Sequence, residues 1–229
     1  MNLLSHFDRI YIINLSSRRD RRQVVAAELA GHGLEIDDCQ VRWTTPPVPE
    51  DSDGFSDTHA RRRFDAHLAV LDEAIAADLA SVVICEDDLR LDPRTDAPAL
   101  SLLWPLCTRE WDFTYLGHGE PLPDSGQPPR WGSTRQALAS TACYALSRRV
   151  MRPLRDHLQA SRTANAAACR LPLEAAYSAF RQASPERLTL IAMPSLVTSA
   201  ANSGLWPRWL SQPFAEHGWL RTTWRHRRV

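Results

Sequence analysis

The chain has 229 residues, of which 44% are hydrophobic and 24% charged, and its formal net charge is zero. These values are typical of one globular domain and exclude a disordered, collagen-like or coiled-coil chain. No run approaches the roughly 18 apolar residues of a membrane span, and the first six residues lack the pattern of a signal peptide. The five cysteines are widely spaced and contain no C-x-x-C pair. This pattern indicates reduced thiols, packed mostly in the core, in a cytosolic protein.

Strands and helices alternate in the amino-terminal part of the chain. The apolar, strand-forming run 10–15 predicts a buried strand. The spacing Ser17-x-x-Asp20 fits a capping box, and it predicts a helix that runs to about His32 and is ended by Gly33. A second strand is expected at 41–44, followed by a loop rich in Pro, Asp and Gly over 45–57.

The clearest helix comes next. Its apolar residues recur at spacings of 4, 3, 4 and 4 and form one stripe: Phe64, Leu68, Leu71, Ile75 and Leu79. Residues 81–85 read as a buried strand and 112–117 as another. Residues 118–135 hold four Pro and three Gly, which predicts a long mobile loop.

The carboxyl-terminal part contains fewer predicted strands. We expect a strand over 140–146, a helix capped by Ser147 that runs to about Leu158, a helix over 173–182 and a strand over 188–192. The alternation of strands and helices favours an α/β fold with a mainly parallel sheet. The second half is expected to add a smaller α+β lobe to that sheet.

Charge is divided unevenly within the single domain that we expect over 1–229. Residues 1–124 carry 12 Arg and 23 Asp or Glu, a net charge of −11, whereas 125–229 carry 15 Arg and 4 Asp or Glu, a net charge of +11. An acidic half can hold a divalent cation, and a basic half can face a phosphate-bearing substrate or an anionic membrane. Alternatively, the two halves neutralise each other in the fold.

The strongest local signal is Glu86-Asp87-Asp88 at the end of a predicted strand. Open α/β sheets bind ligands at the carboxyl ends of their strands, and three adjacent carboxylates repel one another unless a cation offsets them. If the strand pattern continues, Glu86 and Asp88 share one face and can share Mg²⁺ or Mn²⁺ that also bridges a diphosphate. The alternative is a solvated acidic turn.

A second signal lies just after the first strand, where Asn14 and Leu15 precede an Arg-rich helix start with Arg18 and Arg21. A helix amino terminus offers N–H groups to anions, and Arg binds phosphate in a bidentate manner. The alternative is a solvated helix face. No P-loop or G-x-G-x-x-G motif is present, which disfavours those two classes of nucleotide-binding protein.

Two single residues remain open between a structural and a functional role. His67 borders the apolar stripe of its helix, so it either contacts a ligand or packs with one satisfied nitrogen. Glu174 begins a helix, where a carboxylate also complements the helix dipole.

Together these motifs resemble glycosyltransferase family 25, which includes bacterial lipooligosaccharide sugar transferases and procollagen galactosyltransferases. The resemblance covers roughly 9–205 and rests on the order and spacing of several segments. They are Asn14-Leu15…Arg18…Asp20-Arg21-Arg22, the His67 helix, Glu86-Asp87-Asp88, Tyr115-Leu116-Gly117, Thr141–Ser147, Pro172-Leu173-Glu174 and Pro194–Val197 with Ser203. Ala66 stands where the family often has Ser, and Glu174 where it often has Asp.

The resemblance implies a GT-A fold, with a mainly parallel Rossmann-like sheet, and inverting transfer of a hexose, galactose or glucose, from a UDP-sugar to a cell-surface glycan or lipid-linked acceptor. It implies that Glu86 and Asp88 hold Mn²⁺ or Mg²⁺. Asn14, Leu15, Arg18, Arg21 and His67 would lie near the nucleotide, and Asp87 or Glu174 would be the base.

Two other functions remain open: a non-catalytic member of the family that binds a glycan or a partner enzyme, and another metal-dependent phosphotransfer enzyme. We expect a bacterial, cytoplasmic enzyme of lipopolysaccharide biosynthesis with no nucleic-acid partner. Residues 219–229 carry four Arg and two Trp and no acid. Trp and Arg favour an anionic membrane surface, so this tail predicts peripheral attachment at the inner face of the cytoplasmic membrane; packing of the tail on the sheet is the alternative.

Overall fold

The computed structural model of the protein describes residues 2–14, 18–35, 39–118, 128–138, 140–163 and 170–199. Within these ranges the strands are β1 (Arg9–Ile13), β2 (Val41–Thr44), β3 (Ser81–Glu86), β4 (Leu89–Leu91), β5 (Phe113–Gly117), β6 (Arg130–Ser133), β7 (Cys143–Ser147), β8 (Thr189–Met193) and β9 (Val197–Ser199). The α-helices are α1 (Arg19–Gly31), α2 (Thr58–Ala76), α3 (Leu100–Thr108), α4 (Arg148–Thr163) and α5 (Leu173–Ala183), and Leu3–His6 and Pro93–Thr95 form 3₁₀ turns.

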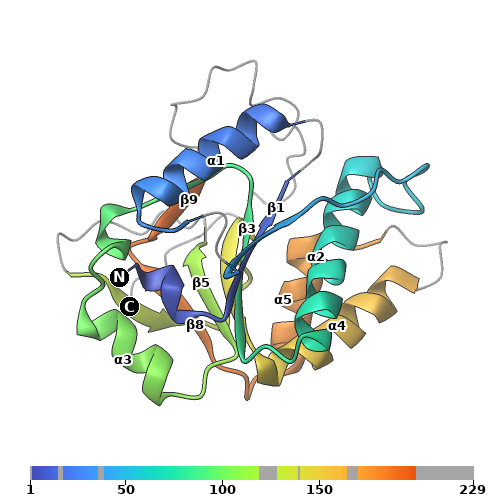
Figure 1. Ribbon diagram of the computed structural model, residues 1–229. Helices are drawn as coiled ribbons and strands as arrows, with labels where there is room; N and C mark the ends of the chain where they lie inside the picture. Colours follow the sequence, from blue (N-terminus) through green and yellow to red (C-terminus); the bar gives the residue numbers. More distant parts are fainter. Residues whose placement is uncertain are drawn as a thin grey trace, which may run out of the picture.

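One seven-stranded sheet organises the molecule, in the order β2-β1-β3-β7-β5-β8-β6 (Figure 1). β2, β1 and β3 are parallel to one another, and β5 and β8 run in the same direction as these three. β7 and β6 run the opposite way. Five of the seven strands therefore share one direction, which confirms the mainly parallel α/β sheet expected from the sequence.

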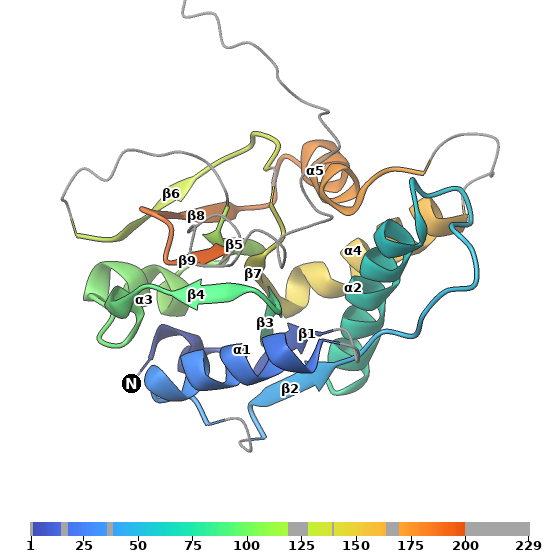
Figure 2. The same ribbon diagram turned by 90° about the horizontal axis from the view of Figure 1, so that it is seen from above.

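Helices cover both faces of this sheet, as the view from above shows (Figure 2). Along β3, Val82 and Ile84 pack with α2, α4 and α5, while Val83 and Cys85 face the opposite way, toward α1 and α3. Side chains of a strand point alternately to its two faces, and a strand covered on both faces needs apolar residues at every position. This requirement explains why β3 is a continuous apolar run.

The two halves of the chain build this sheet together. β7 comes from the second half and lies between β3 and β5 of the first, and β8 and β6 extend the same sheet. The expected smaller lobe is therefore corrected, because the strands of the second half are members of the main sheet. The oppositely charged halves also neutralise each other: arginines of α4 pair with acids of the first half at Arg148–Asp78, Arg149–Glu110, Arg155–Asp72 and Arg162–Asp65.

Most predicted boundaries hold to within two residues, although α4 runs to Thr163, beyond its expected end near Leu158. The amino-terminal cap of α1 is Arg18, without a side-chain hydrogen bond, and the predicted capping residue Ser17 lies outside the described residues. α2 ends at Ala76, and Leu79 of the apolar stripe lies beyond it. Strand β6 lies inside the region predicted to be one loop, because pairing with β8 overrides its local Gly content.

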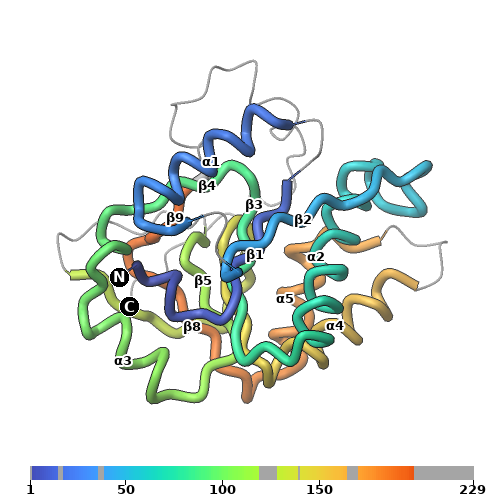
Figure 3. Tube along the Cα trace, in the orientation of Figure 1, coloured from blue at the N-terminus to red at the C-terminus, as the bar shows by residue number. Residues whose placement is uncertain are grey.

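Besides β6, three more strands and α-helices were not predicted: β4, β9 and α3. β4 and β9 pair with each other, and the trace in Figure 3 shows them beside α1, whose Glu28 accepts a hydrogen bond from the backbone N–H of Leu91 at 2.8 Å. α3 is short and contains Pro105. Cys85 and Cys143 are free and buried as expected, whereas Cys39 and Cys107 are exposed, and Cys169 lies outside the described residues.

None of the helices in the described ranges is both long enough and apolar enough to cross a bilayer.

Candidate active site

The sheet changes its winding direction between β1 and β3. From β1 the chain passes through α1 to β2 on one side, and then through α2 to β3 on the other side of β1. In open α/β sheets this reversal leaves a crevice at the carboxyl ends of the two strands, where ligands bind. Asn14 follows β1 and Glu86 ends β3, so both predicted signals meet at this edge.

Asp87 joins the two signals directly. Its Oδ2 accepts a hydrogen bond from Asn14 Nδ2 at 2.8 Å, and its Oδ1 lies 2.8 Å from Arg21 Nη1. Asp87 and Arg21 are both buried. Because both oxygens of Asp87 have partners, the geometry favours a role in holding β1, α1 and β3 together over the role of a base.

The start of α1 lies at the same edge. Asn14 Nδ2 also donates to the backbone carbonyl of Arg18 at 3.2 Å, and the helix begins at the next residue without a side-chain cap from the described residues. Uncapped N–H groups at a helix start attract anions. The Arg18 side chain pairs with Asp20 at 3.2 Å. Leu15 lies outside the described residues.

Arg63 of α2 connects two predicted carboxylates. It lies 2.6 Å from Glu86 and 2.5 Å from Glu174, and its Nη2 donates to Thr141 Oγ1 at 2.6 Å. Burial lowers the pKa of Arg63, but the two carboxylates together raise it above its usual value. Burial raises the pKa of Glu86, and Arg63 opposes that shift. Glu174 from the second half thus reaches the edge where β3 ends.

A buried polar chain runs from this edge into the core. His67 Nδ1 lies 2.6 Å from the Tyr144 hydroxyl, which lies 2.7 Å from the Tyr177 hydroxyl. His67 is fully buried, and burial lowers its pKa well below the usual value, with Arg63 adding to the shift. His67 is thus packed with one satisfied nitrogen, as in the alternative left open by the sequence, and its contact with the nucleotide stays a prediction.

The placement of Asp88 bears on the expected metal. β3 ends at Glu86, and Asp87 and Asp88 form a turn before β4, so the strand pattern that would align Glu86 with Asp88 does not continue. Burial is the main cause that raises the pKa of Glu86, and the negative charge of Asp88 raises it further. The two carboxylates therefore lie close enough to repel each other. In the described part of the chain no three His, Cys, Asp or Glu side chains form a metal-binding cluster.

These residues fit a cation that is held mainly by its substrate. Mg²⁺ in phosphate-transfer sites keeps several waters and takes one or two carboxylates plus substrate phosphates. Asp88 can supply one carboxylate, and Glu86 Oε2 a second, because Arg63 engages Oε1 of that side chain.

The sequence patterns do not identify four residues that lie at this site: Arg63, Thr141, Tyr144 and Tyr177. One signal could have found the first of them: Arg63 and His67 are four residues apart on α2, so they lie on the same helix face. The pairing of Thr141 and Tyr144 with that face depends on β7 lying beside β3, which is a long-range contact.

Comparisons with known proteins give modest but consistent matches. The chain is 26% identical over 129 residues to "Procollagen galactosyltransferase 2" of Mus musculus, covering 48% of this chain and 21% of that protein. It is 25% identical over 136 residues to "Probable inactive glycosyltransferase 25 family member 3" of Bos taurus, covering 52% and 23% respectively. The chain thus spans less than a quarter of these relatives.

Among solved structures, a glycosyltransferase involved in glycosylation of the major capsid of PBCV-1 aligns with a TM-score of 0.45 and 11% identity, covering 80% of this chain and 81% of that one. No family model matches the chain. The two sequence matches confirm that this chain resembles the glycosyltransferase 25 family.

Proposed function

We propose that the protein is a metal-dependent glycosyltransferase that moves a hexose, galactose or glucose, from a UDP-sugar to a glycan or lipid-linked acceptor with inversion. The observation that supports this most is the meeting of Asn14, Arg21 and the Glu86-Asp87-Asp88 segment at the crevice between β1 and β3. The similarity to a procollagen galactosyltransferase sequence supports the transfer of a hexose.

Donor binding is assigned to the edge at the start of α1. The N–H groups of α1 and the Arg18 side chain would bind the diphosphate, and Asn14 and Leu15 would lie beside the nucleotide. Arg21 and Asp87 hold this edge together through their buried ion pair.

Glu86 and Asp88 would hold Mn²⁺ or Mg²⁺ with the donor phosphates. When bound, the cation stabilises the negative charge that develops on the departing diphosphate.

Glu174 is the preferred candidate for the base, ahead of Asp87. Arg63 engages Oε1 of Glu174, whereas both oxygens of Asp87 are engaged. The Glu174 carboxylate, 2.5 Å from Arg63, would accept the proton of the acceptor hydroxyl.

A panel of nucleotide sugars tests the proposal. We expect UDP with Mn²⁺ to raise the melting temperature, and one UDP-hexose to be hydrolysed only when the metal is present. Glu174→Gln should lower transfer to an acceptor by about 100-fold or more while the affinity for UDP is unchanged. A protein that neither binds UDP nor hydrolyses any nucleotide sugar would contradict the proposal.

A specific observation also favours a non-catalytic function. Glu86 and Asp87 are both engaged by arginine side chains, and one relative carries the name "probable inactive". A non-catalytic member would gain thermal stability with UDP and Mn²⁺ yet show neither hydrolysis nor transfer.

We further propose a cytoplasmic location with reversible attachment to an anionic membrane through residues 219–229. This segment lies outside the described residues, and the proposal rests on its four Arg and two Trp. A chain lacking 219–229 should keep its melting temperature but stop sedimenting with anionic vesicles at low salt. If the full chain does not bind these vesicles, the attachment proposal fails.

A further inference from the structure

A basic pocket lies at the edge of the sheet opposite to the candidate active site. Two adjoining cavities of about 160 and 330 Å³ share a lining that includes Thr134, Arg135, Arg187 and Thr189. Thr189 begins β8, which is parallel to β5, so the pocket is at the amino ends of these strands, whereas Asn14 and Glu86 lie at carboxyl ends. The pocket is therefore separate from the proposed donor site.

Arg181 lines the smaller cavity as a buried cation. It is 6% exposed, and it forms no ion pair with any carboxylate in the described part of the chain. Its Nε donates to Thr189 Oγ1 at 3.0 Å and its Nη2 donates to the Gln136 carbonyl at 2.9 Å, while Nη1 has no hydrogen-bond partner. A buried charge is costly unless an opposite charge compensates it.

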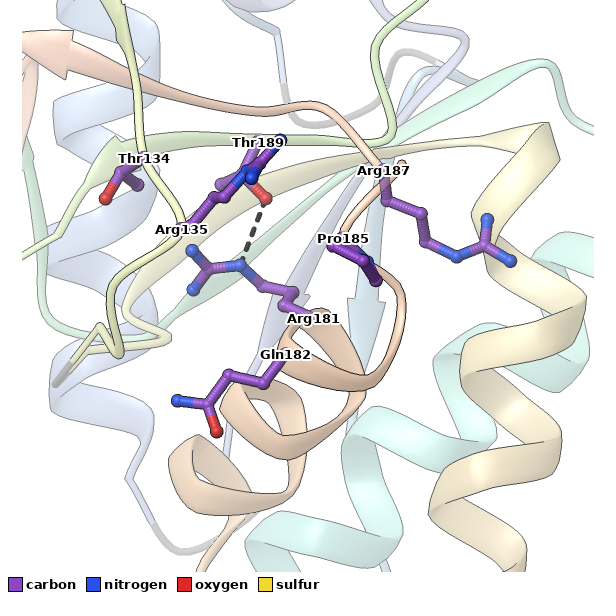
Figure 4. Close-up of a pocket in the computed structure, with 7 residues that line it drawn as sticks. All are labelled: Thr134, Arg135, Arg181, Gln182, Pro185, Arg187 and Thr189. Carbon is purple, nitrogen blue, oxygen red and sulfur yellow. Dashed lines mark hydrogen bonds between the residues drawn. The ribbon is translucent and has the colours of Figure 1, made fainter.

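Three other charged residues line the cavities: Arg135 and Arg187 line both, and Glu186 lines the larger one. Figure 4 shows the side chain of Arg135 directed toward Thr189, as is that of Arg181. The side chain of Arg187 is turned away in the same view, and it lies 3.5 Å from Asp112 and 3.9 Å from the exposed Glu186. Arg187 therefore has its own counter-charges, whereas Arg135 and Arg181 form no ion pair within the described residues and line the same cavity.

Two hydroxyl groups complete a set of donors. Thr189 Oγ1 accepts from Arg181, and Thr134 Oγ1 accepts from the backbone N–H of Gln136 at 3.1 Å. A hydroxyl that accepts one hydrogen bond keeps its own proton to donate. The pocket thus combines two cationic side chains with two oriented hydroxyls, which suits an anion with several acceptor oxygens.

We propose that this pocket binds a phosphate-class oxyanion, held by Arg135 and Arg181 together with the hydroxyls of Thr134 and Thr189. The anion supplies the counter-charge that the buried Arg181 lacks in the described residues. The pocket is large enough for a free phosphate or for the phosphate end of a small phosphomonoester. This inference does not depend on the proposed glycosyltransferase activity.

The test compares melting temperatures in inorganic phosphate, in glycerol 1-phosphate and in NaCl of equal ionic strength. Phosphate should stabilise the wild-type protein more than NaCl. Arg135→Gln removes an exposed side chain and should weaken phosphate binding by about tenfold or more. Arg152→Gln, which removes an exposed arginine of α4 that does not line the pocket, should respond as the wild type does.

Two further arms identify the ligand and the site. If inorganic phosphate raises the melting temperature and glycerol 1-phosphate does not, the ligand is a free anion. If glycerol 1-phosphate raises it as much or more, the ligand is a phosphomonoester. Arg18→Ala, which alters the proposed donor site, should keep the full phosphate response. The proposal is overturned if phosphate acts no differently from NaCl, or if Arg18→Ala loses the response and Arg135→Gln keeps it.

Discussion

Asp88 lies in the turn between β3 and β4, half-buried and close enough to Glu86 to raise its pKa. Asp88→Asn keeps the shape of the side chain and removes its charge. If this carboxylate helps to hold the cation, metal-dependent donor turnover should fall by about 100-fold or more, with little change in melting temperature.

Asp78→Asn is the matched control for that substitution. Asp78 is exposed, lies before β3 at the other edge of the sheet, and has a φ of +52°, which Asn also tolerates. This variant should keep full turnover. Equal activity of the Asp88 variant and the wild type would remove Asp88 from the site.

Arg18 and Arg21 should respond differently to truncation. Arg21 forms a buried ion pair with Asp87, so Arg21→Ala leaves a buried carboxylate with one partner fewer and should cost about 3 kcal/mol of stability. Arg18 pairs with the largely exposed Asp20, and such pairs contribute less than about 1 kcal/mol. Arg18→Ala should therefore weaken UDP binding more than uridine binding without unfolding the protein.

Calorimetric titration with UDP and with uridine, together with thermal unfolding, checks both variants. Equal weakening of the two ligands by Arg18→Ala would show that Arg18 does not contact phosphate.

At the residue scale, the sequence predicted which carboxylates and arginines gather at one edge, because they directly follow apolar strand patterns. It did not predict which side chains pair with each other. The Asn14–Asp87 bond joins residues 73 positions apart, and the Arg63–Glu174 pair depends on how α2 meets α5. Such pairings are set by tertiary packing, which local periodicity does not contain.

Among the elements, β5 and β9 approach each other closely at Gly117. A Cβ added there would lie 2.5 Å from the backbone carbonyl oxygen of Val197, so the two segments would have to separate. Gly117→Ala should cost about 1–3 kcal/mol and lower the melting temperature by several degrees.

Gly31→Ala is the control for that variant. Gly31 is the last residue of α1, and nothing lies within 4 Å of an added Cβ. Because Ala favours the helix, this variant should gain up to about 1 kcal/mol. A loss of stability in Gly31→Ala equal to that in Gly117→Ala would contradict the steric explanation.

The loop before α2 is tied to α4 through Asp53. A hydrogen bond from Arg162 at 2.7 Å is the main cause that lowers the pKa of Asp53, and Arg170 adds to it. A carboxyl group whose folded pKa is lowered stabilises the fold above its unfolded value, near 3.8, and this contribution is lost as the pH falls through the folded pKa.

Below about pH 4, the free energy of unfolding should therefore fall less steeply with decreasing pH in Asp53→Asn than in the wild type. Arg162→Gln should flatten the curve in the same direction, because it removes the main cause of the shift. Urea unfolding at several pH values measures both slopes. Parallel curves for the wild type and Asp53→Asn would exclude this contribution.

Element boundaries followed from sequence wherever a local pattern decided them. The apolar stripe from Phe64 to Ile75 in α2 and the continuous apolar run of β3 are local patterns that the structure reproduces. β4, β6 and β9 were missed because they have only three or four residues, and a strand so short is stabilised by its partner more than by its own sequence.

At the scale of the whole molecule, the opposite charges of the two halves largely pair with each other in ion pairs within the fold. In the described ranges, Arg162 and Arg170 of the second half both pair with Asp53 of the first, and Arg187 pairs with Asp112. The acidic and basic residues are therefore separated along the sequence more than they are separated on the molecular surface. The basic pocket at Arg181 is an exception, since that charge has no acidic partner within the described residues.

The central position of β7 determines when the sheet can close during synthesis. Before residues 143–147 emerge from the ribosome, β1, β2 and β3 can pair with one another, but β3 and β5 each keep an open edge where β7 will later insert. Unpaired edges of apolar strands are sites of aggregation. The first 117 residues, which carry 21 of the 27 acidic residues, must therefore wait for a strand of the basic half. Their excess negative charge gives the nascent chain mutual repulsion, which opposes aggregation until β7 completes the core.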